Sequence, residues 1–162
     1  MILRLAKTVL VFSIALYTTL IALDNLTDSD SNYQFVRHVL MMDSTFPSNH
    51  AMWRALNSPV IHSLFYWMII VWELLSSAVC WCGAVRLAQS IAKPADEFHR
   101  AKGLAVAGLT ISLLLWLGAF LIVGEGWFLM WQSKTANGQA AAFRMFAIIG
   151  IVLLLLAQPD VD

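Results

Sequence analysis

Four long apolar stretches alternate with polar segments along this chain. A helix rises about 1.5 Å per residue, so about 20 apolar residues cross the hydrocarbon core of a bilayer, which is about 30 Å thick. The stretches that approach this length lie at approximately 5–23, 60–86, 103–123 and 140–157. The pattern predicts an all-α fold, a four-transmembrane-helix bundle that makes up a single integral membrane domain over residues 1–162.

The polar segments between the spans carry helix and turn signals of their own. In the connection 24–59, Ser31 and Gln34 have the spacing of a capping box, and Pro47 opens a second segment with apolar residues. We therefore expect two short amphipathic helices over the membrane surface in this loop. The connection 124–139 is rich in aromatic residues, whereas the connection 87–102 is short and basic.

The basic residues near the helix ends predict the orientation of the chain. Six lie near the N-terminus or the connection 87–102, and four lie in or beside the connections 24–59 and 124–139. Because Lys and Arg accumulate on the cytoplasmic side of membrane proteins, we expect a multi-pass protein of the bacterial inner (cytoplasmic) membrane, with both termini cytoplasmic. No small-residue cleavage site precedes Asp24, so we expect the first helix to be retained rather than removed as a signal peptide.

Composition supports the membrane assignment and removes one class of partner. Hydrophobic residues make up 60% of the chain and charged residues 12%, with a mean hydropathy of +0.74. This is far more apolar than an ordinary soluble domain, so we expect the lipid bilayer to surround the protein. Ten basic and ten acidic residues cancel, and this balance gives no indication of a nucleic-acid partner.

A polar stripe follows one face of the second predicted span. At 100° per residue, His62, Tyr66, Glu73 and Ser77 share this face. A carboxylate inside a membrane helix is expensive and should face protein rather than lipid. Glu73 is therefore either a proton or cation site or, as we favour, a structural group that hydrogen-bonds to Ser76, Ser77, Tyr17 or a partner subunit.

The charged residues of the two outer loops are expected to lie close together. They are Asp24, Asp28, Asp43, Glu125, Arg37, Arg54 and Arg144. Partly buried ion pairs among them would fix how the loops cover the helices, and with Trp53 and Trp131 they would form an interaction surface. A clamp for a substrate carboxylate, built from Arg54 or Arg144, is the alternative interpretation.

The sequence offers little framework for a cofactor, a metal or catalysis. A haem between helices needs two facing ligands, and His62 is the one histidine in the predicted spans. A zinc site is a weak alternative because the spacing of its ligands matches no compact motif. Those ligands would be His38, His50, His62 and Asp43. With no nucleophile elbow, phosphate loop or zinc-protease motif present, we expect no cofactor, no metal and no enzymatic activity.

Several short motifs, mostly in the outer loops, resemble those of a known family. They are Asp24-Asn25 with Thr27-Asp28, Asn32-Tyr33 with Phe35-Val36 and His38-Val39, Thr45-Phe46-Pro47 leading to Trp53-Arg54, Trp131-Gln132-Ser133, and Asn137-Gly138-Gln139 followed by Phe143-Arg144. With this arrangement the chain resembles, over almost its whole length, a bacterial family of uncharacterised, predicted small integral membrane proteins. The resemblance implies four membrane helices and no established activity.

Together these observations favour a non-catalytic small integral membrane protein that serves as an accessory or assembly subunit of a larger inner-membrane complex. Its partners would be other membrane protein subunits or further copies of itself, because a second protein could satisfy Glu73. The alternative is a small transporter or a proton- or ion-conducting homo-oligomer in which Glu73 lines the path. A membrane enzyme, or a quinone or haem protein that uses His62 and Glu73, is the weakest hypothesis.

Overall fold

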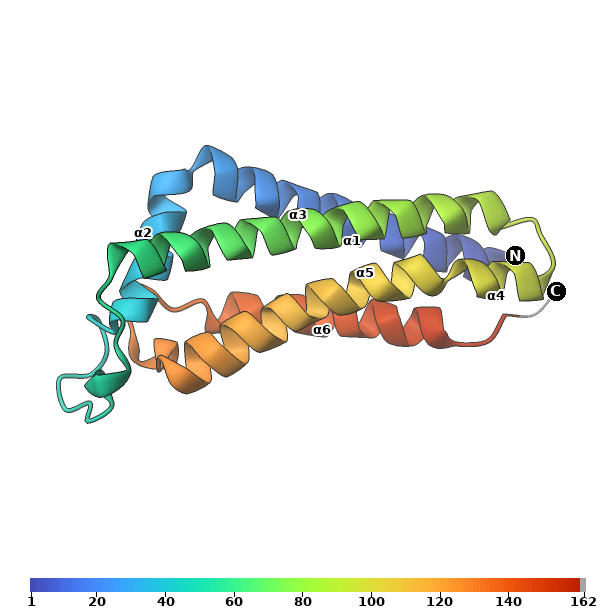
Figure 1. The fold of residues 1–162 in the computed structure, drawn as a ribbon. Coiled ribbons are helices and arrows are strands. Elements are labelled where there is room, and N and C mark those ends of the chain that lie inside the picture. Colours follow the sequence, from blue (N-terminus) through green and yellow to red (C-terminus); the bar gives the residue numbers. More distant parts are fainter. Residues whose placement is uncertain (161–162) are drawn as a thin grey trace.

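The computed structural model describes residues 1–160 and shows a bundle of long helices (Figure 1). Four helices of the described chain are long and apolar enough to cross a membrane. They are α1 (Ile2–Thr27), α3 (Pro59–Ser90), the continuous run of α4 (Ala95–Ala101), α5 (Gly103–Leu114) and η2 (Leu115–Trp127), and α6 (Gln139–Ala157). The prediction of an all-α four-helix membrane bundle is confirmed.

The two ends of the bundle are built differently. At one end, which we call the terminal end, α1 begins, α6 ends and α3 turns into α4 (Figure 1). The opposite end, which we call the loop end, carries α2 (Ser29–Met41), two single-turn helices and the loops around them. Those turns are η1 (Met52–Arg54) and η3 (Met130–Gln132).

The loop 24–59 contains one helix and one isolated turn rather than the two helices expected. α2 begins at Ser29, directly after α1, so Ser31 lies inside it and does not cap it. Gln34 Oε1 instead accepts a hydrogen bond from Arg37 at 2.9 Å. Farther along, Asn49 Oδ1 accepts a bond from the Ala51 N–H at 2.7 Å, a local turn that competes with helix formation.

The third span is longer than predicted and changes its helical form midway. The segment expected as a loop over 87–102 is largely helical, because α3 extends to Ser90 and α4 starts at Ala95. From Leu115 to Trp127 the helix is a π-helix, in which the Phe128 N–H donates to the Val123 carbonyl at 3.0 Å. A π-helix is wider than an α-helix and is normally a single turn, so this long stretch widens one wall of the bundle.

α3 and α5 approach each other closely in the part of the bundle from Ser77 to the terminal end, which we call the terminal half. A Cβ atom added to Gly108 would lie 2.7 Å from the backbone nitrogen of Cys80, and one added to Gly83 would overlap the backbone of Ala105. Helices approach this closely only at residues without bulk. The remaining part, from Ser77 to the loop end, we call the loop half.

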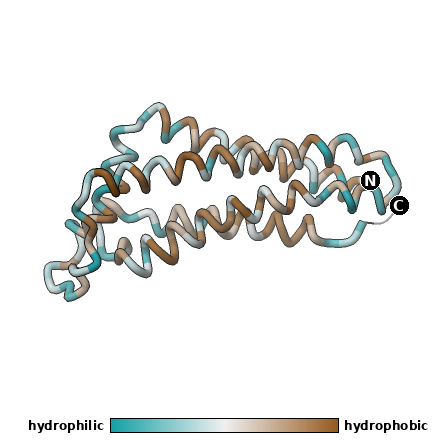
Figure 2. The backbone as a smooth tube through the Cα atoms, in the orientation of Figure 1, coloured by the Kyte–Doolittle hydropathy of each residue, from teal (hydrophilic) through white to brown (hydrophobic). Residues whose placement is uncertain are grey.

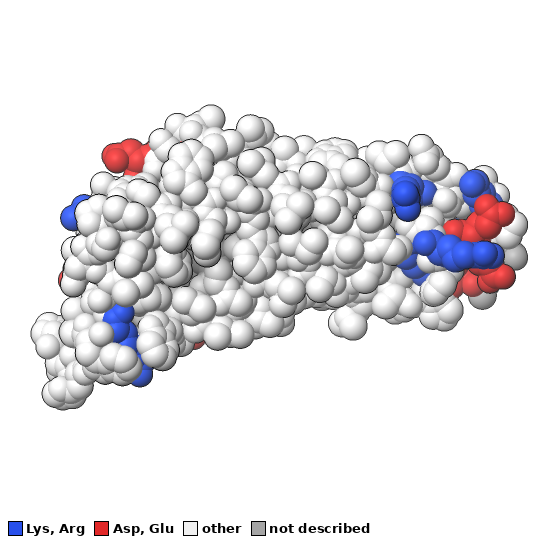
Figure 3. All heavy atoms as spheres, viewed as in Figure 1, with Lys and Arg blue, Asp and Glu red and all other residues white. Residues whose placement is uncertain are grey.

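The outer surface of the bundle is a wide uncharged belt between two charged ends (Figure 3). Apolar residues run along the helices, and hydrophilic residues gather at the ends (Figure 2). Large side chains on this belt are strongly exposed, including Val71 at 61%, Ile151 at 66% and Leu154 at 72%. Exposure on this scale suits lipid rather than water, which supports a multi-pass integral membrane protein.

Candidate binding site in the loop half of the bundle

A polar cavity of about 340 Å³ lies in the loop half, where α1, α2, α3, η2 and α6 meet. Its polar lining residues are Tyr17, Asp24, Asn25, Asn32, Tyr66, Glu73 and Arg144. The structure thus brings together three of the five residues predicted for the intramembrane polar site, Tyr17, Tyr66 and Glu73, with Asp24 and Arg144 of the predicted outer surface. His62 and Ser77 do not line the cavity.

Glu73 is the buried acid of this cavity and has a partner within the chain. Glu73 is 3% exposed, and its Oε2 accepts a hydrogen bond from Asn25 Nδ2 at 2.7 Å. Tyr66 holds the same asparagine from the other side, because its hydroxyl donates to the Asn25 carbonyl at 2.5 Å. Asn25 is the third residue from the end of α1, so Glu73 lies beside the loop-end terminus of that helix.

The serines expected to bind the Glu73 carboxylate have other partners. Ser76 donates to the backbone carbonyl of Glu73 at 2.9 Å, and Ser77 shares a hydrogen bond of 2.6 Å with Thr19. Thr19 also accepts a bond from Trp81 Nε1 at 2.9 Å. Ser77, Thr19 and Trp81 therefore join α1 and α3 on the side of Glu73 that faces the terminal end.

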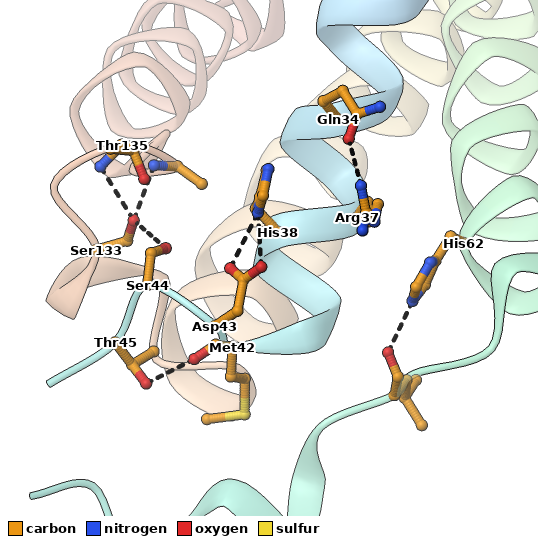
Figure 4. Close-up of polar contacts among 12 residues, drawn as sticks. Gln34, Arg37, His38, Met42, Asp43, Ser44, Thr45, His62, Ser133 and Thr135 are labelled. Atoms are coloured by element: carbon orange, nitrogen blue, oxygen red, sulfur yellow. Dashed lines mark hydrogen bonds and ion pairs between the residues drawn. The ribbon is translucent and has the colours of Figure 1, made fainter. Parts of the chain in front are cut away.

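His62, also predicted for the polar stripe, is buried outside the polar cavity. It is 2% exposed, and its Nε2 lies 2.7 Å from the carbonyl of Leu56 (Figure 4). Tyr17, in contrast, lines the cavity but is 40% exposed. The helical periodicity identified the correct face of α3, yet Asn25 and Thr19 on α1 were missed because nothing in the sequence gives the register between the two helices.

A second, apolar cavity of about 410 Å³ adjoins the polar one. It lies between α2, α3 and the π-helix η2, and its wall includes Phe65, Met68, Trp72, Leu115 and Gly118. Four side chains line both cavities, namely Phe35, Val36, Ile69 and Phe120. The two spaces are therefore neighbours on either side of a shared apolar wall.

The predicted ion pairs among the outer loops do not form among the described residues. Asp43 pairs with His38, whose Nδ1 lies 2.8 Å from Oδ2 (Figure 4), and Glu125 accepts a hydrogen bond from Gln139 at 2.8 Å. Arg37 binds Gln34 as described above. Asp24, Asp28 and Arg144 are exposed to a degree that leaves little gain in pairing, because surface ion pairs contribute only about 0–1 kcal/mol.

Arg54 joins the two loops through aromatic rings rather than through a carboxylate. Its guanidinium lies 5.2 Å from the ring centroid of Trp53 and 4.8 Å from that of Trp127, and it donates to the Trp127 carbonyl at 3.2 Å. The rings of Phe46 and Trp131 also meet between the loops, in an edge-on contact with their centroids 5.8 Å apart. We call these five residues the aromatic lobe.

Polar contacts strengthen the same junction. Ser44 and Ser133 share a hydrogen bond of 2.7 Å across the two loops, and Ser133 Oγ accepts a bond from the Ala136 N–H at 2.8 Å (Figure 4). The loops 42–57 and 128–138 are thus fastened to each other at several points.

The side chains considered for a zinc site do not gather at one point. Over residues 1–160, no group of three or more His, Cys, Asp or Glu side chains is placed to hold a metal ion. His38 and Asp43 form a pair, whereas His62 is occupied by a backbone carbonyl. The described residues therefore do not support the zinc alternative.

A buried charged cluster closes the terminal end. Asp160 binds Lys7 at 2.7 Å and also Lys102, and the side chains of all three are at most 5% exposed. Both lysines donate in addition to the carbonyl of Gln158, at 2.7 and 2.8 Å. Burial alone would raise the pKa of Asp160, but the hydrogen bonds and positive charges of Lys102 and Lys7 hold it below its ordinary value.

Comparison with known proteins agrees with this architecture. Residues 3–159 match the model of the family described as "Predicted small integral membrane protein (DUF2165)". The chain belongs to this family. The match covers nearly the whole bundle, loops included, and confirms the expected resemblance. No curated protein and no solved structure matches the chain.

Proposed function

We propose that this family member is a non-catalytic accessory or assembly subunit of a larger bacterial inner-membrane complex, and that the aromatic lobe contacts the partner. The observation that carries the proposal is the fastening of two separate loops into one exposed aromatic surface. Trp53 at its centre is 73% exposed, although it stacks on Arg54. Trp and Arg are the residues most often responsible for binding energy at protein interfaces.

The chemistry of the lobe indicates what the partner offers. Arg54 has aromatic rings and a carbonyl around it but no carboxylate among the described residues. A partner that supplies apolar side chains and one acidic group would complement both parts of this surface. The positive charge near the terminal end, from Arg4, Lys7 and Lys93, supports an orientation in which that end is cytoplasmic and the lobe faces outward.

Purification from the native membrane tests this proposal. We expect a stoichiometric partner protein to accompany the tagged chain in mild detergent, and mass spectrometry identifies it. The double variant Trp53→Ala/Arg54→Ala should lose the partner, whereas Trp67→Ala should retain it, because Trp67 is also exposed, at 54%, but lies on the lipid-facing side of α3. A homo-oligomer with no companion, or a partner kept by both variants, contradicts the proposal.

Conduction of protons or ions by a homo-oligomer is the second candidate, and the polar cavity around Glu73 is the observation in its favour. Such a path would have to leave the single bundle, because Gly108 packs closely against the backbone of Cys80 between the cavity and the terminal end. Flux into proteoliposomes that changes on Glu73→Gln would support this function. Equal flux with both proteins would remove it.

A further inference from the structure

Beyond partner binding, we propose that the polar and apolar cavities form one binding site for a zwitterionic phospholipid whose head group carries a primary ammonium. One of its two acyl chains would occupy the apolar cavity, and the phosphate and ammonium would occupy the polar one. This site is separate from the aromatic lobe, so either proposal can fail without the other.

The position of the two cavities suits an amphiphile. They share a wall of Phe35 and Val36 from α2, Ile69 from α3 and Phe120 from η2. A molecule whose apolar and polar parts are joined would reach past these side chains and have each part in a matching environment. A wholly polar or wholly apolar ligand would leave one of the two spaces without a suitable occupant.

The apolar cavity has the character of an acyl-chain site. Trp72 is the lining residue of this cavity with a side-chain N–H group. That group, Nε1, already donates to the Ile111 carbonyl at 2.9 Å. Gly118 faces free space, since an added Cβ meets no atom within 4 Å. The wall thus offers apolar contact and room but no hydrogen-bonding group, which suits a hydrocarbon chain.

The polar cavity supplies charges of both signs. Arg144 lies on α6, about 7.5 Å along the helix from Gln139. Among the described residues it has neither an ion pair nor a hydrogen bond, and its guanidinium is therefore available to an anionic group of a ligand. A phosphate is the group that a guanidinium binds best.

The ammonium would find its acceptors on the other wall. Glu73 Oε2 is occupied by Asn25, but Oε1 has no donor among the described residues, although the residue is 3% exposed. Asp24 lines the same cavity, and its carboxylate has no partner within residues 1–160. A primary ammonium has three N–H donors and suits two such carboxylates, whereas a quaternary ammonium has none. A purely anionic head group would meet repulsion from both acids.

Native mass spectrometry of the delipidated protein with added lipids tests the proposal. We expect phosphatidylethanolamine to be retained about tenfold more strongly than phosphatidylcholine or phosphatidylglycerol, since charge-assisted hydrogen bonds carry such a difference. Asp24→Asn should remove most of this preference, whereas Arg144→Gln should weaken the retention of all three lipids, because each of them carries the phosphate. Both residues are exposed, so these variants should fold.

A matched pair of glycine variants tests the acyl-chain half of the site. Gly118→Leu should fill the apolar cavity and weaken phosphatidylethanolamine retention about tenfold. Gly103→Leu should have no effect, because Gly103 also faces free space but lies outside both cavities. Equal retention of all three lipids, unchanged selectivity in Asp24→Asn, or unchanged retention in Arg144→Gln would overturn the proposal. Preference for an added uncharged quinone over phosphatidylethanolamine would overturn it as well.

Discussion

The terminal half and the loop half of the bundle use the same four helices in opposite ways. In the terminal half, small residues let α3 and α5 approach closely, and a buried cluster of two lysines and Asp160 closes the end. In the loop half, a π-helix and the inserted α2 hold the helices around two cavities. Close packing stabilises a structure, and open space leaves room for a ligand. We therefore expect the terminal half to contribute most to stability, and we propose the loop half as the part that binds a ligand.

The strongest test of this division is to separate α3 from α5. Gly83→Leu would place side-chain atoms where the backbone of Ala105 lies, and a backbone cannot move aside as a side chain can. We expect a loss of about 3 kcal/mol or more in unfolding free energy, measured by Trp fluorescence during denaturation in mixed micelles. Gly103→Leu is the control and should change stability by less than about 0.5 kcal/mol. Equal stability of both variants would show that the contact is not tight.

Removing the charge of Asp160 should have the next largest effect. Asp160→Asn leaves Lys7 and Lys102 buried without a carboxylate, and breaking a buried pair costs about 3 kcal/mol. Because its pKa is lowered in the folded protein, the carboxylate stabilises the fold above its ordinary pKa of about 4. That contribution should be lost as the pH falls through the lowered pKa. Stability curves of the two proteins that differ equally at pH 7 and at pH 2 would contradict this assignment.

A change in the loop half should cost less. Asn25→Leu removes the donor to Glu73, and an unsatisfied buried acceptor costs about 1–2 kcal/mol. The cavity beside Glu73 gives water access to the carboxylate, which limits the loss. A double-mutant cycle with Glu73→Gln measures the coupling of the two side chains. A cost as large as that of Gly83→Leu would show that the loop half is as tightly constrained as the terminal half.

The smallest effect is expected at the exposed pair of His38 and Asp43. Their side chains are 40% and 33% exposed, and surface ion pairs contribute about 0–1 kcal/mol. His38→Asn should therefore leave the unfolding midpoint nearly unchanged in the same assay. A clear destabilisation would indicate that the loops contribute to the stability of the bundle.

The membrane spans could be predicted from the sequence because each depends on local composition. The polar face of α3 could also be predicted, since it depends on helical periodicity within one segment. The partners across helices were not, because the Glu73–Asn25 contact joins residues 48 positions apart and depends on the relative shift of α1 and α3. The charged loops were misjudged for a related reason. Opposite charges in two loops suggest pairing, but Arg54 gains more from two aromatic faces than from an exposed carboxylate.

Cysteine reactivity in nanodiscs tests the division between the two halves most directly. Cys82 is exposed and would first be replaced by Ala, which leaves Cys80, buried in the terminal half, as an internal reference. A new cysteine, Tyr17→Cys, reports on the polar cavity. We predict that a small charged thiol reagent modifies the cavity cysteine rapidly and leaves Cys80 unmodified from either face. Modification of both cysteines at similar rates would contradict the account, because the polar space would then continue through the terminal half.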